Sequence, residues 1–254
     1  MPKTVIYDFG SNNGDDIPYY LLKADLVVAV EANPVLANHI KQRFRAEIGD
    51  NRLIVENCVL TDSREASAVP FYIHKQGHVL SQFPRPADAL MKDFHEAHLP
   101  AKRASDIIRA YGDPEYVKID LEQYDHVVLS DLLANDIRPS YISAESHSVK
   151  PFCLLVAVGD YTSFKLVDGA SVAKKYANCE IVTPHGKRLH SFPDHSAGPY
   201  GNDIRGPWMT ENNVFHVLAY AGLGWKDVHA SRIDSPDVNY RPQPQFRLSV
   251  NMDY

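Results

Sequence analysis

Residues 4–33 read TVIYDFGSNNGDDIPYYLLKADLVVAVEAN, and the order of residue types in this stretch is the clearest pattern in the chain. An apolar, β-branched run ends at Phe9 and Gly10, and a short loop of small and amide residues follows it. Residues 17–23 then have the composition of a helix, and a second apolar run over residues 26–30 stops at the acid Glu31. The pattern predicts a strand–loop–helix–strand unit.

The loop and the acid suit an adenosine ligand at the edge of a sheet. Gly10 and Gly14 permit backbone angles and a close approach that a Cβ would block, and helix N-terminal amides can donate to the ligand. Glu31 follows Asp8 by 23 positions; an acid about 20 residues on commonly binds ribose hydroxyls. Neither G-x-G-x-x-G nor G-x-x-x-x-G-K-[ST] occurs. The alternative is an ordinary strand–turn–helix with a solvated glutamate.

The same stretch resembles the first two motifs of the FkbM family of S-adenosylmethionine-dependent methyltransferases. The resemblance rests on YDFGSNNGDDIPYYL and VVAVEANP, then on NCVLTDSREASAVPFY, RASDII, EYVKIDLEQYDHVVL and SYISAESHS in the family's order. It covers residues 4–150 well and the remainder loosely, chiefly through HSAGPYGNDIRGPW. It implies a Rossmann-like class I methyltransferase fold, S-adenosyl-L-methionine as cofactor, and O-methylation of a hydroxyl on a carbohydrate, a glycan or a secondary metabolite.

The resemblance also implies which residues contact the cofactor. They belong to the glycine loop, the acid after the second strand with its neighbour, and the region that closes over the adenine in the family: Asp8, Gly10, Asn12, Asn13, Gly14, Glu31, Asn33 and Asn57. Two other functions remain open. One is an NAD(P)-dependent oxidoreductase on the same architecture, against which the missing G-x-G-x-x-G counts. The other is a catalytically silent module that keeps the cofactor pocket.

Beyond residue 33, strand-like and helix-like segments alternate, which is typical of βαβ units and a doubly wound, mainly parallel sheet in an α/β fold. A single methyltransferase domain over residues 1–254 is predicted. Asn33 followed by Pro34 is a helix start. The expected strands are residues 52–60, 69–74, 116–121, 139–145, 163–167 and 246–250, and the expected further helices are residues 104–111, 126–133, 152–158 and 214–223.

Two long segments have little periodicity and are expected to cover the site. Residues 75–103 form a predicted lid, because loops of this length in compact domains are commonly functional. Residues 184–213 are rich in Gly, Pro, His and Asp and are expected to be an ordered insertion. In that insertion, the segment beginning at His195 and the aromatic side chains of Tyr200 and Trp208 are candidates to contact an acceptor, the two aromatics by stacking on a sugar ring.

The composition of the chain limits the kinds of molecule that it is expected to bind. A net charge of −6 and a pI near 6.0 argue against a broad nucleic-acid or membrane surface and favour a small-molecule or glycan acceptor. The three cysteines (Cys58, Cys153 and Cys179) have no C-x-x-C spacing, a pattern of reducing compartments. The N-terminus lacks a basic–apolar signal pattern. A cytoplasmic protein is predicted.

Charged residues cluster where the strand at residues 116–121 ends. Lys118 and Asp120 share one face of that strand, and Glu122 follows. The family pattern here is K-I-D-x-E-G, and Gln123 replaces its glycine, so a wider turn is expected. Lys118, Asp120 and Glu122 are candidates for catalysis; the alternative is a structural brace between Lys118 and the carboxylates, with Asp125 as the cap of the next helix.

The following strand also ends in ionisable residues, Glu145 and His147. A hydroxyl acceptor must lose its proton as the methyl group arrives, and imidazole titrates near neutral pH. His147 is therefore the first candidate for the general base, with Glu145 to orient it and Asp120 as the competing base. Asp120, Glu145 and His147 would also suit a divalent ion, but no metal-ligand motif supports this and no metal is predicted.

Overall fold

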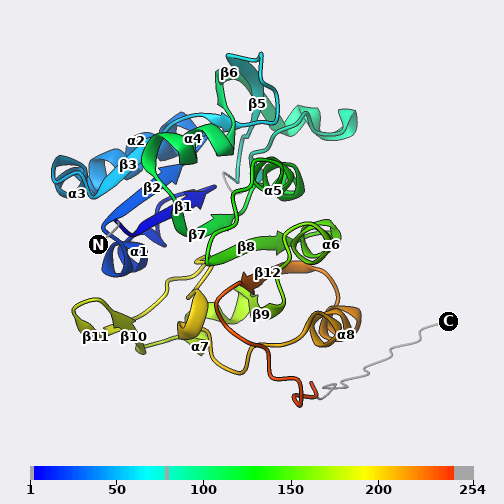
Figure 1. Ribbon diagram of the computed structural model, residues 1–254. Helices are drawn as coiled ribbons and strands as arrows, with labels where there is room; N and C mark the ends of the chain where they lie inside the picture. The colour runs from blue at the N-terminus through cyan, green and yellow to red at the C-terminus, as the bar shows by residue number, and fades with distance from the viewer. Residues whose placement is uncertain (1–2, 78–79, 243–254) are drawn as a thin grey trace.

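The computed structural model describes residues 3–77 and 80–242. Its centre is a seven-stranded sheet with the strand order β3-β2-β1-β7-β8-β12-β9 (Figure 1). Six of these strands run in the same direction, and β12 runs opposite to them. The strands are β1 (Val5–Phe9), β2 (Leu26–Val30), β3 (Leu53–Glu56), β7 (Pro114–Ile119), β8 (Tyr141–Ser146), β9 (Ser163–Asp168) and β12 (Gly224–Ser231). The predicted mainly parallel α/β fold is confirmed.

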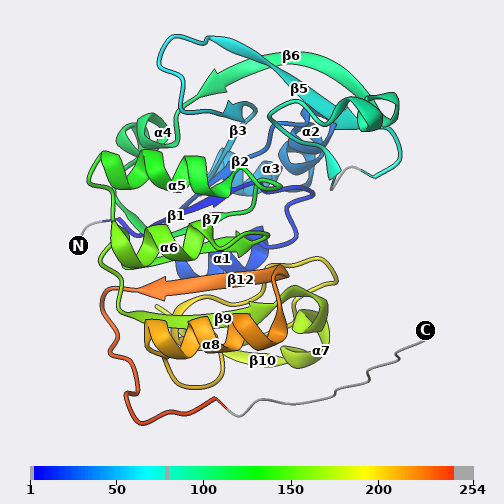
Figure 2. The same ribbon diagram turned by 90° about the vertical axis from the view of Figure 1, so that its right-hand side faces the viewer.

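Helices cover both faces of the sheet, as a doubly wound fold requires. One face carries α4 (Ala104–Tyr111), α5 (Asp125–Ala134), α6 (Lys150–Ala157) and α8 (Glu211–Ala221), which face the viewer in Figure 2. The other face carries α1 (Ile17–Lys23) and α2 (Pro34–Arg43). The shorter helices are α3 (Arg45–Gly49), α7 (Val172–Lys175) and the 3₁₀ helices η2 (Asp88–Asp93), η3 (Gly169–Ser171) and η4 (Gly201–Asp203).

The side chains of the first strand, β1, are buried in the hydrophobic cores on both faces of the sheet. Successive side chains of a strand point to opposite faces, so Tyr7 and Phe9 pack with Leu129 of α5, and Ile6 packs with Tyr20 of α1. Burial on both faces explains why the strands of this sheet read as continuous apolar runs. The helix start at Asn33 is confirmed as well, since its side chain accepts a hydrogen bond from the Val35 amide at 3.0 Å.

The prediction of one strand over residues 52–60 is wrong. The segment forms β3 and then, after a break, β4 (Val59–Leu60), which pairs with β6 (Phe94–Lys102) outside the central sheet. β6 also pairs antiparallel with β5 (Ala68–His74), so the three strands make a second sheet beyond β3. The predicted lid over residues 75–103 is thus too long: its last third is strand, and its role as a lid stays a prediction for residues 75–93.

The strand β12 was not predicted, and it is the element that completes the central sheet. It inserts antiparallel between β8 and β9, where Figure 2 shows it in orange. Its sequence, GWKDVHAS, is rich in polar residues and has no apolar run that would indicate a strand. The second half of the strand, from Asp227 to Ser231, is nevertheless buried. The predicted strand over residues 246–250 lies outside the described residues, and the extent of one domain over residues 1–254 stays a prediction.

The insertion at residues 184–213 includes part of a hairpin, β10 (Cys179–Thr183) and β11 (Gly186–His190), followed by an irregular segment. Tyr200 and Trp208, expected to stack on an acceptor, are instead buried. Tyr200 stacks on Tyr116 of β7 with ring centroids 4.2 Å apart, and Trp208 stacks on Tyr141 of β8. This prediction is wrong because both rings fill the core beneath the insertion. None of the helices in the described ranges is long and apolar enough to span a bilayer.

Candidate functional site

A cavity of about 400 Å³ opens where the parallel strands β1, β2, β7 and β8 end. This is the edge at which doubly wound folds bind ligands, and the volume suits a small molecule. Its wall combines the glycine loop, the ends of four strands, the loop before η2 and the start of β12. The lining residues are Gly10, Asn12, Val30, Glu31, Ala32, Leu36, Cys58, Val59, Leu60, Phe71, Leu80, Ser81, Gln82, Phe83, Asp120, Leu121, Glu122, Tyr124, Glu145, His147, His195 and Trp225.

At one end, Glu31 is 8% exposed and is held by the backbone around it. Its Oε2 accepts a hydrogen bond from the Asn12 amide at 2.8 Å, and its Oε1 accepts one from the Asn33 amide at 2.7 Å. Burial raises the pKa of Glu31 to about 7, although the two amides act in the opposite direction. Asn57 fixes the turn behind it by donating to the carbonyls of Glu31 and Ala32.

The glycine loop crosses the ends of β1 and β7 at very close range. Gly10 has φ +87°, and a Cβ built on it would lie 1.9 Å from the Asp120 carbonyl oxygen, so no other residue fits without moving the strand end. Two residues on, Asn12 also has a positive φ. Its Oδ1 is buried and has no hydrogen-bond partner among the described residues. An unpartnered acceptor on a cavity wall indicates a site built for a ligand donor.

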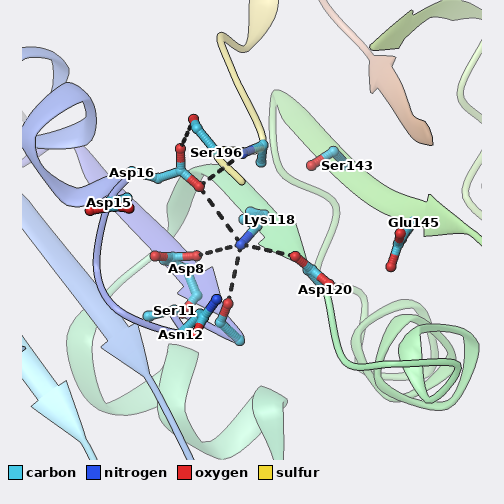
Figure 3. Close-up of polar contacts among 12 residues, drawn as sticks. Asp8, Ser11, Asn12, Asp15, Asp16, Lys118, Asp120, Ser143, Glu145 and Ser196 are labelled. Atoms are coloured by element: carbon cyan, nitrogen blue, oxygen red, sulfur yellow. Dashed lines mark hydrogen bonds and ion pairs between the residues drawn. The ribbon is translucent and has the colours of Figure 1, made fainter. Parts of the chain in front are cut away.

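Beneath the loop, Lys118 of β7 holds a cluster of carboxylates together (Figure 3). Its Nζ lies 3.3 Å from Asp120 Oδ2, 3.4 Å from Asp8 Oδ1 and 3.9 Å from Asp16 Oδ2, and it donates to the Gly10 carbonyl at 3.1 Å. Burial disfavours the ammonium, but the carboxylates outweigh it and raise the pKa of Lys118 well above its usual value. The side chain does not line the cavity; its position is that of the predicted brace.

The other end of the cavity joins an imidazole to carboxylates. His147 Nε2 lies 2.9 Å from Glu145 Oε2 and 3.9 Å from Glu122 Oε2. Burial, followed by the charge of Asp120, raises the pKa of Glu145 well above the usual range of a carboxyl. Burial and Asp120 also raise the pKa of Glu122, to about 7. Glu145 and Glu122 therefore titrate at higher pH than free glutamates do.

The turn after β7 keeps its shape although it lacks the family's glycine. Gln123 has φ +76° and Glu122 has φ +46°, so both adopt the left-handed conformation that glycine favours. Both residues are strained there, and Glu122 nevertheless reaches the cavity wall.

The prediction that Asp125 caps the following helix is wrong. α5 begins at Asp125 itself, after Tyr124, and no side chain caps it. The Asp125 carboxylate is 2% exposed and accepts a hydrogen bond from the Glu145 amide at 3.3 Å, which ties α5 to the end of β8. Burial and then Asp120 raise its pKa to about 7.

This pKa predicts how the stability of the ligand-free protein depends on pH. Between its unfolded pKa near 3.9 and about 7, Asp125 binds a proton in the folded state only. Its contribution to the free energy of unfolding therefore falls as pH rises through this window. In urea titrations at pH 5 and pH 8, we expect Asp125→Asn to reduce the loss of stability between the two by about 2–3 kcal/mol.

The exposed Asp136, on the loop after the same helix, provides the matched control for this measurement. Asp136→Asn should leave the difference between pH 5 and pH 8 unchanged. If Asp125→Asn lost as much stability between pH 5 and pH 8 as the unmodified protein does, Asp125 would be ionised in the folded protein at both pH values.

The predicted site residues fall into two groups. Those that line the cavity are Gly10, Asn12, Glu31, Asp120, Glu122, Glu145 and His147. Those that lie behind the wall are Asp8, Asn13, Gly14, Asn33, Asn57 and Lys118; they hold the lining residues or the loop, and a direct role for them stays a prediction. Sequence reasoning gave no site role to Asp16, Phe71, Phe83, Tyr124 and Trp225. The first, second and fourth of these lie within the motifs quoted above, but residue type alone does not show which side chains of a motif reach the site, and the other two belong to no motif.

A comparison with protein families identifies the family of the chain. A family model, the methyltransferase FkbM domain, matches residues 8–164. Similar solved structures include an FkbM methyltransferase from Methylobacillus flagellatus KT, with 13% identity, a TM-score of 0.45 and coverage of 65% of this chain and 39% of that one. A precorrin-6y C5,15-methyltransferase from Geobacter metallireducens GS-15 has 10% identity and a TM-score of 0.35 over 74% of this chain and 73% of that one.

A third structure, StiE O-MT residues 961–1257, has 13% identity and a TM-score of 0.36 over 94% of this chain and 70% of that chain. No curated protein matches the chain. The family match covers more than half of the chain and includes the cavity residues from Gly10 to His147.

Proposed function

Because this chain belongs to the FkbM methyltransferase family, we propose that it uses S-adenosyl-L-methionine to methylate a hydroxyl of a carbohydrate, a glycan or a secondary metabolite. The observation that carries the proposal is that a single cavity combines two kinds of site at its opposite ends. One end has a glycine loop and a buried acid, Glu31. The other has His147 against carboxylates, which is the arrangement that proton removal from an acceptor needs.

The residues at the Glu31 end fit an adenosyl group. Each Glu31 carboxylate oxygen accepts one backbone hydrogen bond and keeps lone pairs for the two ribose hydroxyls. The unpartnered Asn12 Oδ1 is available to a donor on the ligand. Val59 and Phe71 line the same cavity and would cover the adenine ring. Gly10 lines the same cavity, so the loop presents its backbone to the ligand there.

When bound, the cofactor supplies a methyl group on a positively charged sulfur. His147 would take the acceptor's proton as the hydroxyl oxygen is methylated. Its Nε2 is engaged with Glu145 at 2.9 Å, so Nδ1 is the nitrogen that would face the hydroxyl. Glu145 is then a positioning residue that fixes the ring. Asp120, the competing base, is engaged by the Lys118 ammonium at 3.3 Å.

Cofactor binding tests the first half of the proposal. By isothermal titration calorimetry, S-adenosylmethionine and S-adenosylhomocysteine should bind and NAD should not. We expect Glu31→Gln to weaken the affinity about 100-fold or more, since hydrogen bonds to a charged group contribute about 1.5–3 kcal/mol each and two are disturbed. Glu65→Gln, at an exposed glutamate away from the cavity, should bind normally. Equal affinity in Glu31→Gln would contradict the assignment.

Methyl transfer tests the second half. The protein is incubated with S-adenosylmethionine carrying a labelled methyl group and a panel of monosaccharides, glycans and hydroxylated metabolites. Label should appear on a hydroxyl of at least one of them, and the position is read by mass spectrometry. Transfer confined to nitrogen, carbon or thiol acceptors would refute O-methylation while leaving the family assignment intact.

A further inference from the structure

Two aromatic side chains form a wall at the carboxylate end of the cavity. Trp225, at the start of β12, is 39% exposed, and His195 comes from the insertion. Their ring centroids are 5.7 Å apart and their planes differ by 20°, so the two rings stack. Both line the cavity together with Glu145 and His147. We call this pair the aromatic wall.

The indole of the aromatic wall is held in place by the backbone beneath it. A Cβ built on Gly169 would lie 2.2 Å from Cε2 of Trp225 and 2.3 Å from its Nε1. Only a residue without a side chain therefore fits against the ring at this point. Because the packing fixes the indole before any ligand arrives, little conformational entropy would be lost on binding.

The other half of the wall is anchored to the glycine-loop side of the molecule. The Asp16 carboxylate accepts hydrogen bonds from the Ser196 hydroxyl and, at 3.1 Å, from the Ala197 amide (Figure 3). Asp16 and Ser196 are both buried. Their neighbour His195 has φ +69°, a conformation that needs such support in a residue with a side chain. The exposed imidazole is thus fixed through its own backbone.

The aromatic wall is far from the end that suits adenosine. In the strand order, β12 is four positions from β2, the strand that ends at Glu31. At about 4.8 Å per strand, the two ends are roughly 19 Å apart along the sheet. The wall therefore stands beside the proposed base, where the acceptor and not the donor's adenosine would lie.

Apart from the two imidazoles, the ionisable side chains that line this end of the cavity are carboxyl groups. Asp120, Glu122 and Glu145 line this end, and no lysine or arginine is among the described residues that line the cavity. The nearby ammonium of Lys118 lies beneath the loop and is shared by carboxylates. A phosphate or carboxylate on the acceptor would find no lysine or arginine to pair with among these lining residues, whereas hydroxyl and ammonium groups would find carboxyl oxygens that accept hydrogen bonds.

We propose that the aromatic wall is the acceptor subsite for a sugar ring that is neutral or carries an amino group. The apolar C–H face of the sugar lies against the exposed part of the stacked Trp225 and His195 rings. Its hydroxyls donate to Asp120, Glu122 and Glu145. Sugars with a phosphate or a carboxylate are rejected. The inference rests on the proposed function and narrows its acceptor from hydroxyl compounds in general to uncharged or cationic sugars.

Tryptophan fluorescence tests where the sugar binds. The chain has two tryptophans, and Trp208, a residue of the insertion, is buried against Tyr141. Trp208→Phe therefore leaves Trp225 as the reporter. With S-adenosylhomocysteine bound, methyl glucoside, methyl galactoside, methyl rhamnoside and glucosamine are titrated in turn. At least one should shift the emission and protect it from iodide quenching. Glucuronic acid and glucose 6-phosphate should bind at least tenfold more weakly than that sugar.

Calorimetry on variants tests the two side chains. Trp225→Ala and, separately, His195→Ala should each weaken binding of the best sugar at least tenfold without changing the affinity for S-adenosylhomocysteine. His195→Ala removes only an exposed ring, so it remains informative if Trp225→Ala fails to fold. Phe215→Ala, at an exposed aromatic of α8 outside the cavity, is the matched control and should bind both ligands normally.

Three results would overturn the subsite: unchanged sugar affinity in both wall variants, equal or tighter binding of the anionic sugars, or a Trp225 emission that no sugar alters. These outcomes differ from a failure of the proposed function, which would appear as absent binding of S-adenosylmethionine or absent transfer to oxygen. Normal cofactor binding and sugar methylation with unaffected Trp225→Ala and His195→Ala would refute the subsite alone.

Discussion

Replacement of His147 by glutamine is expected to lower kcat for methyl transfer by about 10²–10⁴-fold, the usual contribution of a positioned general base. The cofactor affinity should not change, because the imidazole lies at the opposite end of the cavity from Glu31. Glutamine keeps a polar side chain of similar reach but cannot accept the proton. Single-turnover rates with the sugar identified in the transfer screen, at saturating cofactor, measure the chemical step directly.

The neighbours of His147 supply the controls. Glu145→Gln should lower kcat by a smaller factor than His147→Gln, since it removes the partner that orients the ring but leaves the ring itself. His185→Gln, at an exposed histidine on the β10–β11 turn, should have no effect. If His147→Gln transferred methyl groups at the normal rate while Asp120→Asn did not, the base would be Asp120 and the role of His147 would need another explanation.

The parts of this fold that were predictable are those whose cause is local. The run ending at Phe9, the loop at Gly10 and the helix start at Asn33 and Pro34 follow from residue type at short range, and all occur as expected. The place of Glu31 on the cavity wall was predictable as well, because the apolar run over residues 26–30 shows in the sequence where the strand ends. Parallel topology then brings such ends to one edge.

The parts that were not predictable depend on contacts between distant segments. Asp125 reads as a helix cap, but the Glu145 amide, 20 residues on, binds its carboxylate and draws it into the core. Tyr200 looks suited to a sugar ring, yet it stacks on Tyr116. Trp225 carries no local signal at all, because its place at the cavity depends on β12 inserting between β8 and β9. Tertiary packing overrides residue type at each position.

The role of Lys118 also depends on contacts with distant segments, and its replacement is expected to have a large effect on the stability of the protein. Its ammonium is 4% exposed and is the cation nearest to two buried carboxylates, Asp8 and Asp16. Both Asp8 oxygens lack a hydrogen bond from the described residues, so the ion pair with Lys118 at 3.4 Å is their compensation. We expect Lys118→Met to lower the free energy of unfolding by about 3–5 kcal/mol, the loss that follows when one partner of a buried ion pair is removed.

Urea unfolding followed by circular dichroism measures this loss, with Lys174→Met on the exposed side of α7 as the control that should change stability by less than about 0.5 kcal/mol. Adding Asp8→Asn to Lys118→Met should restore part of the stability, because it removes one of the unpaired charges. If the double variant lost the sum of the stabilities that the two single variants lose, Asp8 and Lys118 would not interact.

The pH dependence of the same variant separates an unpaired charge from a packing defect. Without the ammonium, the buried carboxylate of Asp16 has no cation beside it among the residues that the structure describes and can be neutralised only by a proton. Even with Lys118 present, burial raises the pKa of Asp16 to about 6. Protonation at pH 5 should therefore relieve the repulsion, and the deficit of Lys118→Met should be smaller at pH 5 than at pH 8. A deficit that is equal at both values would mean that the methionine fits poorly and that the carboxylates never needed the lysine.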